Sequence, residues 1–238
     1  MTQTPHGVTG MHMTTIEAQK SLLRLKYKTI RQQISHIQAN TTSDKITHYF
    51  LAYFSQLLHK NSVIAAYYPI NHELDTLPLV AILRDLNCKI ALPQMNRDHA
   101  LIFREWRYDD KLLKPDNKFF EPAGSAIVLE PNIIIVPMLA GDRHGNRLGY
   151  GQGNYDRAIA HHRQQDDNVI VMGVCYEAQI SDEDLPAMTH DQKMDYIITE
   201  GGVITACPIP VMTQSAPDID RDCRKYKHQS LAHSHRPQ

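Results

Sequence analysis

Ile133-Ile-Ile-Val-Pro-Met138 is an apolar run that leads into Gly141-Asp-Arg-His-Gly-Asn-Arg-Leu-Gly-Tyr-Gly-Gln-Gly-Asn-Tyr-Asp-Arg157, a segment rich in glycine and arginine. The run is typical of a buried strand, and the residues after the segment predict a helix. A glycine-rich loop between a strand and a helix is typical of an anion site, because free amides at a helix N-terminus favour negative charge. Arg143, Arg147 and Arg157 would each add a planar cation suited to phosphate.

Two common phosphate-binding motifs are excluded. The string Gly-x-x-x-x-Gly-Lys-Ser/Thr does not occur, so this is not a Walker loop. Gly149-Tyr-Gly151-Gln-Gly153 has the wrong last spacing for a dinucleotide fingerprint, and about a dozen residues separate it from the strand. We therefore expect a third kind of nucleotide loop.

Outward from this segment, apolar patterning predicts strands that alternate with helices. We expect strands at 63–68, 89–92, 100–107, 133–136, 169–174 and 196–199, and helices at 16–38, 43–59, 77–86 and after the glycine-rich loop. Pro69 and Pro93 are expected to end strands, Thr42 or Ser43 to cap the second helix, and Trp106 to pack against the core. This alternation favours an α/β fold with a mostly parallel central sheet and helices on both faces.

The composition is that of one globular domain. The chain has 238 residues, of which 42% are hydrophobic and 21% charged, and its formal net charge is −1. We expect residues 1–13 to be a disordered leader, 14–203 to form the domain and 204–238 to be a loosely ordered tail. The charge argues against a nucleic-acid partner, and no apolar run approaches a membrane span. The four cysteines lack Cys-x-x-Cys spacing, which favours a cytoplasmic protein with free thiols, Cys88 and Cys175 being buried.

The longest specific string resembles a known family signature. Gly145-Asn-Arg-Leu-Gly-Tyr-Gly-Gln-Gly-Asn-Tyr-Asp156 is similar to that of the 5-formyltetrahydrofolate cyclo-ligase family, also called methenyltetrahydrofolate synthetases. Other segments match in order, namely Lys20 and Arg24 in the first helix, Tyr67-Tyr-Pro-Ile-Asn-His-Glu-Leu-Asp-Thr76, Leu92-Pro-Gln94 and Met194-Asp-Tyr-Ile-Ile-Thr-Glu200. The resemblance covers residues 14–203 and implies a three-layer α/β fold similar to the NagB/RpiA/CoA transferase-like arrangement.

The resemblance implies an ATP-dependent ligase that forms a C–N bond. The family reaction closes 5-formyltetrahydrofolate to 5,10-methenyltetrahydrofolate and releases ADP and phosphate. Phosphorylation turns the formyl oxygen into a leaving group, and N10 of the folate then attacks the activated carbon. Such a step needs positioning and charge neutralisation around the γ-phosphate. The implied ligands are 5-formyltetrahydrofolate, ATP and Mg²⁺, and we expect a monomer or a weak homodimer.

By the same resemblance, the first helix and the glycine-rich loop bind ATP. Arg147 would neutralise charge on the transferred group and is the expected catalytic residue. Lys20 and Arg24 stand one helical turn apart and would reach the phosphates, although the pattern alone favours a solvated basic face. The expected ATP-binding residues are Lys20, Arg24, Arg147, Leu148, Gly149, Tyr150, Gly151, Gln152, Gly153, Asn154 and Tyr155.

The folate is expected to contact Tyr68, Glu73, Tyr150 and Asn154. A glutamate at position 73 suits the pterin, because a carboxylate can accept two parallel N–H bonds from an aminopyrimidine. The alternative role for Glu73, at the start of the next helix, fits Asp75 better. Tyr68 lies in a predicted strand, so a core position is its alternative.

Two aspartates are expected to serve magnesium. Asp156 begins the helix after the loop, and Asp195 begins the last predicted strand. The resemblance implies that both serve Mg²⁺ bound to ATP, since this ion prefers carboxylate, phosphate and water oxygens. The alternatives are a helix cap for Asp156 and an exposed strand-edge position for Asp195.

One departure from the family pattern motivates a second hypothesis. The family loop usually ends Gly-Tyr-Tyr-Asp, whereas this chain has Gly153-Asn-Tyr-Asp156. Asn154 therefore supplies an amide where an aromatic ring would stack on folate. This favours, as an alternative, a non-catalytic folate- or nucleotide-binding module on the same fold. Nucleic-acid binding through the basic first helix is a third hypothesis, which lacks aromatic platforms.

Overall fold

A seven-stranded, mostly parallel sheet forms the centre of the molecule in a computed structural model that describes residues 15–206, except 97, 99 and 116–118. The predicted leader and nearly all of the predicted tail lie outside the described residues. The strand order is β3-β2-β1-β4-β7-β8-β9, and only the outer strands β3 and β9 run antiparallel to their neighbours. The strands are β1 Val63–Ala65, β2 Lys89–Met95, β3 Leu101–Glu105, β4 Ile133–Pro137, β7 Ile170–Val174, β8 Tyr196–Thr199 and β9 Gly202–Thr205.

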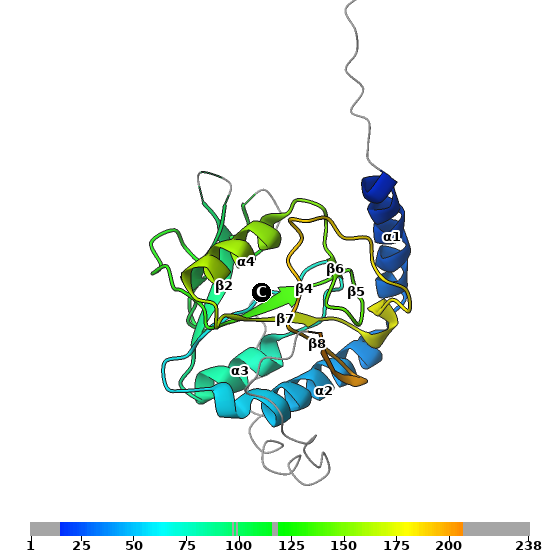
Figure 1. Ribbon diagram of the computed structural model, residues 1–238. Helices are drawn as coiled ribbons and strands as arrows, with labels where there is room; N and C mark the ends of the chain where they lie inside the picture. Colours follow the sequence, from blue (N-terminus) through cyan, green and yellow to red (C-terminus); the bar gives the residue numbers. More distant parts are fainter. Residues whose placement is uncertain (1–14, 97, 99, 116–118, 207–238) are drawn as a thin grey trace, which may run out of the picture.

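Helices cover both faces of this sheet, as predicted (Figure 1). The helices α2 (His36–Phe54) and α3 (Leu77–Asp85) pack on one face, where Phe50, Phe54 and Leu83 are fully buried. The helix α4 (Asn154–Gln165) packs on the other face with Ile159. The central strands are apolar on both sides, which is the pattern that two covering layers require.

The first helix, α1 (Thr15–Gln32), lies to one side beside a small hairpin (Figure 1). The hairpin consists of β5 (Ala140–Gly141) and β6 (Arg147–Leu148). Buried Tyr27 of α1 packs in a cluster with Leu139, Ala140, Leu148 and Leu185. No helix in the described part of the chain is long and apolar enough to cross a membrane.

The predicted boundary between the first two helices was wrong. The first helix ends at Gln32 rather than residue 38, because Ser35 caps a new helix by accepting a hydrogen bond from Gln38 N at 3.2 Å. Thr42 and Ser43, the expected caps, are buried inside α2, and the Ser43 hydroxyl donates to the Asp75 carbonyl at 2.5 Å.

The strand around Pro93 also departs from the prediction. Strand β2 continues through Pro93 to Met95 instead of ending at the proline. Strand β1 pairs with β2 only as far as Ala91, so at Pro93 strand β2 has a neighbouring strand on one side only, β3. The N–H that proline lacks is therefore not needed for hydrogen bonds to strands on both sides. The prediction that Trp106 packs against the core is confirmed, since it is 8% exposed.

Candidate active site

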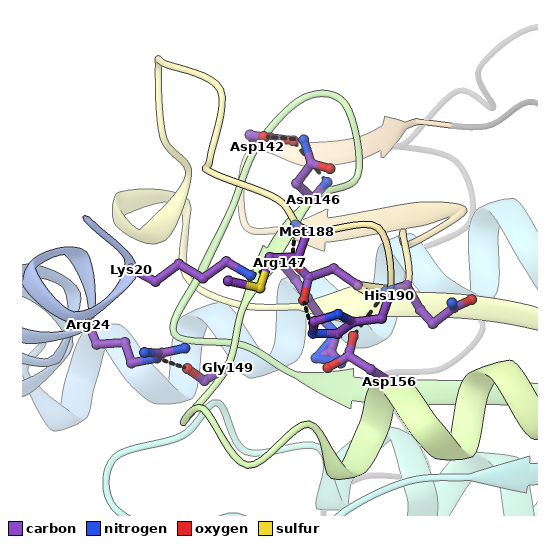
Figure 2. A network of polar contacts seen from close by, with 11 residues as sticks. Lys20, Arg24, Asp142, Asn146, Arg147, Gly149, Asp156, Met188 and His190 are labelled. Carbon is purple, nitrogen blue, oxygen red and sulfur yellow. Dashed lines mark hydrogen bonds and ion pairs between the residues drawn. The ribbon is translucent and has the colours of Figure 1, made fainter. Parts of the chain in front are cut away.

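The turn of the β5–β6 hairpin is organised around one buried carboxylate. Asp142 is 1% exposed and accepts hydrogen bonds from the amides of His144, Asn146 and Leu185 at 2.8–2.9 Å, and from the Asn146 side chain at 2.8 Å. At Gly145 the backbone has φ +78°, and a Cβ there would lie 2.5 Å from the Met194 carbonyl oxygen, so only glycine fits. This turn fixes the residue that follows it, Arg147 (Figure 2).

Arg147 is a buried cation that faces a carboxylate. Its side chain is 6% exposed, and its Nη2 lies 2.8 Å from Asp156 Oδ1 on the first turn of α4 (Figure 2). Its guanidinium also lies over the Tyr155 ring, 5.9 Å from the centroid. Burial lowers the pKa of Arg147, while the charges of Asp156 and Asp191 act in the opposite direction. Its buried Nε makes no hydrogen bond with any described residue, which leaves a donor for a ligand.

Two cations of α1 point towards the loops on either side of α4, Lys20 towards the loop before β8 and Arg24 towards the glycine loop (Figure 2). Lys20 is 7% exposed and pairs with Asp191, and Arg24 donates from Nε to the Gly149 carbonyl at 2.9 Å. Lys26 and Lys28 on the same helix are exposed. The interpretation as a solvated basic face is therefore correct for those two lysines but not for Lys20.

A cavity of about 940 Å³ connects these groups. It lies at the carboxyl ends of the parallel strands, where ligands bind in open α/β sheets. All the predicted ATP-binding residues line it, as do Tyr68, Glu73 and Asp156. The cavity is also lined by residues that the sequence analysis missed, including Phe119, Phe120, Met188, His190 and Asp191.

The glycine loop forms one wall of this cavity, and at Gly151 it lies against Arg24. Gly151 has φ +96°, and a Cβ there would lie 3.1 Å from Arg24 Cζ.

We expect Gly151→Ala to raise the KM for ATP about tenfold, because left-handed strain of about 1–2 kcal/mol would shift the loop from Arg24. Gly149→Ala is the matched variant, since its Cβ would make an ordinary contact at 3.6 Å with Arg147 Nη1. Steady-state kinetics at varied ATP measure both, and equal effects would contradict the role given to the Gly151 conformation.

An aromatic wall, made of Tyr68, Phe119 and Phe120, also lines the cavity. The Tyr68 ring lies 4.6 Å from that of Phe120 and 6.5 Å from that of Trp106, measured between centroids. Tyr68 is half-buried, so it is both a support for this cluster and a lining residue. A flat heterocycle fits such a wall.

Glu73 presents a carboxylate to the same cavity. Its Oε2 accepts a hydrogen bond from the Ile70 amide at 3.1 Å. Burial raises the pKa of the Glu73 carboxyl, and the Ile70 N–H and the charge of Arg31 partly oppose this. Asp75, predicted to cap the next helix, lies one residue before the N-cap Thr76, and its Oδ1 accepts a hydrogen bond from the first amide of α3, that of Leu77, at 2.9 Å.

Asp195 is not brought to the cavity, which corrects the expected pairing of Asp156 with Asp195. Its carboxylate accepts hydrogen bonds from Arg163 at 3.0 Å and from the Val171 amide at 2.7 Å. Asp195 precedes β8 and therefore lies at the amino ends of the parallel strands, opposite the cavity. Asp191, in the loop before β8, does line the cavity together with Asp156.

Asp191 was missed because its loop carries no pattern of its own. The available signal was the polar stretch Thr189-His-Asp-Gln192, which lies a few residues before an apolar strand. Interactions with Lys20 and the Met188 amide lower the pKa of Asp191 although burial would raise it. Among the described residues, no group of three or more histidine, cysteine or acidic side chains could hold a metal by itself.

Two other loop residues also differ in their roles. Arg143, one of three arginines predicted to face phosphate, is exposed and does not line the cavity. Asn154 does line it, and its side chain bonds to Arg157 Nη2 at 2.7 Å and to Gln152 Oε1 at 3.0 Å. The amide thus stiffens the loop at the position where the family usually has a tyrosine.

Comparisons with known proteins agree with this geometry. The model of the 5-formyltetrahydrofolate cyclo-ligase family matches residues 16–200. The chain is 28% identical over 163 residues to the 5-formyltetrahydrofolate cyclo-ligase of Haemophilus influenzae, covering 66% of this chain and 85% of that protein. It is 31% identical over 156 residues to the Mycolicibacterium smegmatis protein of the same name, covering 62% and 78%.

Two solved structures share the fold. The 5,10-methenyltetrahydrofolate synthetase of Aquifex aeolicus superposes with a TM-score of 0.65 at 24% identity, covering 82% of this chain and 96% of that one. The synthetase of Mycoplasma pneumoniae superposes with a TM-score of 0.59 at 21% identity, covering 79% and 98%. At these identities the structural likeness bears on the fold alone.

Proposed function

Since the chain belongs to the 5-formyltetrahydrofolate cyclo-ligase family, whose members are ATP-dependent ligases, we propose that its cavity is where 5-formyltetrahydrofolate is closed to 5,10-methenyltetrahydrofolate. One observation carries this assignment to the cavity. A single space of about 940 Å³ is lined by three cations and also by an aromatic wall and the Glu73 carboxylate. A triphosphate suits the cations, and a pterin suits the aromatic wall and the carboxylate.

At the phosphate end, Lys20, Arg24 and Arg147 surround the glycine loop. Arg147 is held by Asp156 and shielded from solvent, so its charge acts in a medium of low dielectric. A fixed cation of this kind stabilises the charge that develops on the γ-phosphoryl group during transfer. Lys20 and Arg24 come from another element and would close the loop over the phosphates.

Magnesium is the proposed companion of ATP, and Asp156 and Asp191 are the residues we propose to hold it. Both carboxylates line the cavity, and both act on the same guanidinium, that of Arg147. One or two carboxylates suffice for Mg²⁺, because it keeps water and phosphate oxygens in its shell. When bound, the ion would neutralise negative charge on the phosphates. Both aspartates now pair with Arg147 or Lys20, cations that phosphates would attract.

At the folate end, Glu73 would accept hydrogen bonds from the pterin ring, which would lie against Tyr68 and Phe120. The bound folate would present its formyl oxygen to the γ-phosphate. That oxygen bonds to phosphorus as ADP leaves, and the N10 lone pair then attacks the formyl carbon. That attack closes the ring, N10 releases its proton to solvent, and phosphate departs with the formyl oxygen as the methenyl C=N bond forms. The protein's work is positioning and electrostatics, with no protein nucleophile.

Glu73→Gln should raise the KM for 5-formyltetrahydrofolate about 10–100-fold, because it removes a charge-assisted hydrogen bond. The raised pKa of Glu73 also predicts a pH effect. As the pH falls, this carboxyl gains its proton earlier than an exposed glutamate would, so wild-type KM should rise on the acid side.

The pH dependence of KM from 5 to 8 measures this effect, which the glutamine variant should lack. Glu183→Gln, at an exposed site, is the matched control. An acid limb that persists in Glu73→Gln would show that another group causes it.

The function itself is tested by absorbance at the methenyltetrahydrofolate band after mixing the protein with 5-formyltetrahydrofolate, Mg²⁺ and ATP. We expect a rise that requires all three components. ATP binding in a parallel titration without any rise would favour the non-catalytic binding module, and Asn154→Tyr would then be the first variant to make.

A further inference from the structure

The loop before β8 is fastened to α4 at two levels, and Gln192 makes both contacts. Its backbone amide donates to Asp156 Oδ1, on the first turn of the helix, at 3.0 Å. Its side-chain Oε1 accepts from Arg163 Nη1, on the last turn, at 3.3 Å. Gln192 is half-buried and lines the main cavity, that of about 940 Å³. The two contacts therefore hold the cavity side of this loop against the helix.

Arg163 is itself anchored by a carboxylate that lies away from the cavity. Its Nη2 donates to both oxygens of Asp195 at 3.0 Å, and Asp195 also accepts from the Val171 amide of β7 at 2.7 Å. The Asp195 side chain is 13% exposed. A guanidinium held in this way has few orientations, so its Nη1 is a fixed donor for Gln192. Asp195 is thereby connected to the cavity without lining it.

Asp156 uses only one of its two oxygens in contacts with the protein. Its Oδ1 lies 2.8 Å from Arg147 Nη2 and also accepts the hydrogen bond from the Gln192 amide (Figure 2). Its Oδ2 accepts no hydrogen bond from any residue that the structure describes. Two donors on one oxygen fix the plane of the carboxylate and leave the second oxygen available to a cation.

Asp191, the residue before Gln192, shows the same division. Its Oδ2 accepts from Lys20 and, at 2.7 Å, from the Met188 amide. Within the described part of the chain, the nearest cationic partner of its Oδ1 is His190 Nε2 at 3.9 Å, which is too long for a hydrogen bond. Each of the two aspartates therefore has one oxygen held by the protein and one available.

We propose that Gln192 and Arg163 are positioning residues that set the separation of Asp156 and Asp191. This inference rests on the proposed function, in which the two aspartates hold Mg²⁺ beside ATP. They come from different elements, so their separation depends on how the loop before β8 lies on α4. Mg²⁺ demands a nearly ideal octahedral shell, and residues that orient its ligands typically control its affinity. Gln192 adjoins one aspartate and bonds to the other, so it is the link between them.

Gln192→Ala tests the link, because it removes the contact with Arg163 and keeps the backbone amide. The Kd of ATP would be measured by isothermal titration without folate, once with excess Mg²⁺ and once with EDTA. Wild type should bind ATP more tightly with Mg²⁺. The variant should bind the magnesium complex about tenfold more weakly, the lower end of the effect of residues that orient metal ligands, while its Kd in EDTA stays within about twofold. Lys193→Ala, an exposed neighbour that does not line the cavity, is the matched control.

Arg163→Met tests the other half of the link. It should weaken binding of the magnesium complex as Gln192→Ala does, and the double variant should be no weaker than either single one, because all three break one connection. In turnover, each variant should need about tenfold more Mg²⁺ for half-maximal rate and approach the wild-type kcat when Mg²⁺ saturates. A general loss of stability would not produce that difference. Thermal unfolding would establish that Arg163→Met is folded, since it leaves Asp195 without its cation.

Three outcomes would overturn the inference. One is that Gln192→Ala and Lys193→Ala gain as much from Mg²⁺ as wild type does. Another is that the effects of Gln192→Ala and Arg163→Met add in the double variant. The third is that Mg²⁺ does not strengthen ATP binding to wild type, which would also reject the proposed metal ligands. If the magnesium effects appear as expected but no methenyltetrahydrofolate forms, the proposed reaction fails and the positioning role stands.

Discussion

Replacing Arg147 with alanine should lower kcat about a thousandfold, in the range found when a fixed transition-state cation or donor is removed. The guanidinium is 6% exposed and lies 2.8 Å from Asp156, so water cannot easily take its place. The KM for 5-formyltetrahydrofolate should change little, because Glu73 and the aromatic wall remain. Single-turnover absorbance measurements at saturating ATP would determine the chemical step.

Arg143→Ala is the matched control for this experiment. Arg143 lies in the same hairpin turn, but it is exposed and does not line the cavity, so its loss should leave kcat within twofold, as for most surface substitutions. Near-ultraviolet circular dichroism would establish that Arg147→Ala is folded, since the change also leaves Asp156 without its partner. A folded Arg147→Ala protein with wild-type kcat would refute the catalytic role.

The largest effect on stability is expected for Asp142→Ala, which should lower the free energy of unfolding by about 3 kcal/mol. Removal of one carboxylate leaves three amide donors and one side-chain donor without an acceptor, and each buried unsatisfied donor costs about 1–3 kcal/mol. The predicted loss is smaller than the sum of these four costs, because the turn can relax and admit water. Urea unfolding followed by fluorescence gives the free energy.

Two further variants make the Asp142 result specific. Asp184→Ala removes an exposed carboxylate that lies 3.2 Å from His144 Nε2, and it should change stability by less than about 0.5 kcal/mol. Asp142→Asn keeps the shape and one oxygen, so it should fall between wild type and Asp142→Ala. If all three variants unfold alike, the hydrogen bonds of Asp142 do not stabilise the hairpin.

Much of the fold was predictable because its signals are local. The apolar runs identified the parallel strands, and the Gly145–Asp156 string identified the loop that lines the main cavity. The error between α1 and α2 arose because Ser35 lies in a stretch without glycine or proline, where the pattern gives little sign of a break. The continuation of β2 through Pro93 depends on where its neighbour β1 stops, and pattern alone cannot show that.

The site was harder to predict where it depends on distant pairs. Asp156 follows directly from the loop, but choosing Asp191 over Asp195 requires knowing which end of a strand faces the cavity. The burial of Lys20 depends on a partner in the loop before β8, and the burial of Arg31 depends on Tyr150. Sequence periodicity describes neighbouring residues only. It does not carry such information, because each of these contacts joins two segments that are far apart in the sequence.

Three of the cations of α1 make contacts that also bear on how the protein folds. Lys20 meets Asp191, Arg24 meets Gly149 and Arg31 meets Tyr150, with separations of 171, 125 and 119 residues along the chain. Contacts this far apart in sequence close late and slow the search for the native state. The helix that leaves the ribosome early must therefore wait for the segment just before β8 before its side of the site is complete. Ligand binding should therefore require a nearly complete chain. Fragments that lack either Lys20 or Asp191, the two ends of the longest of these spans, should not bind the ligand.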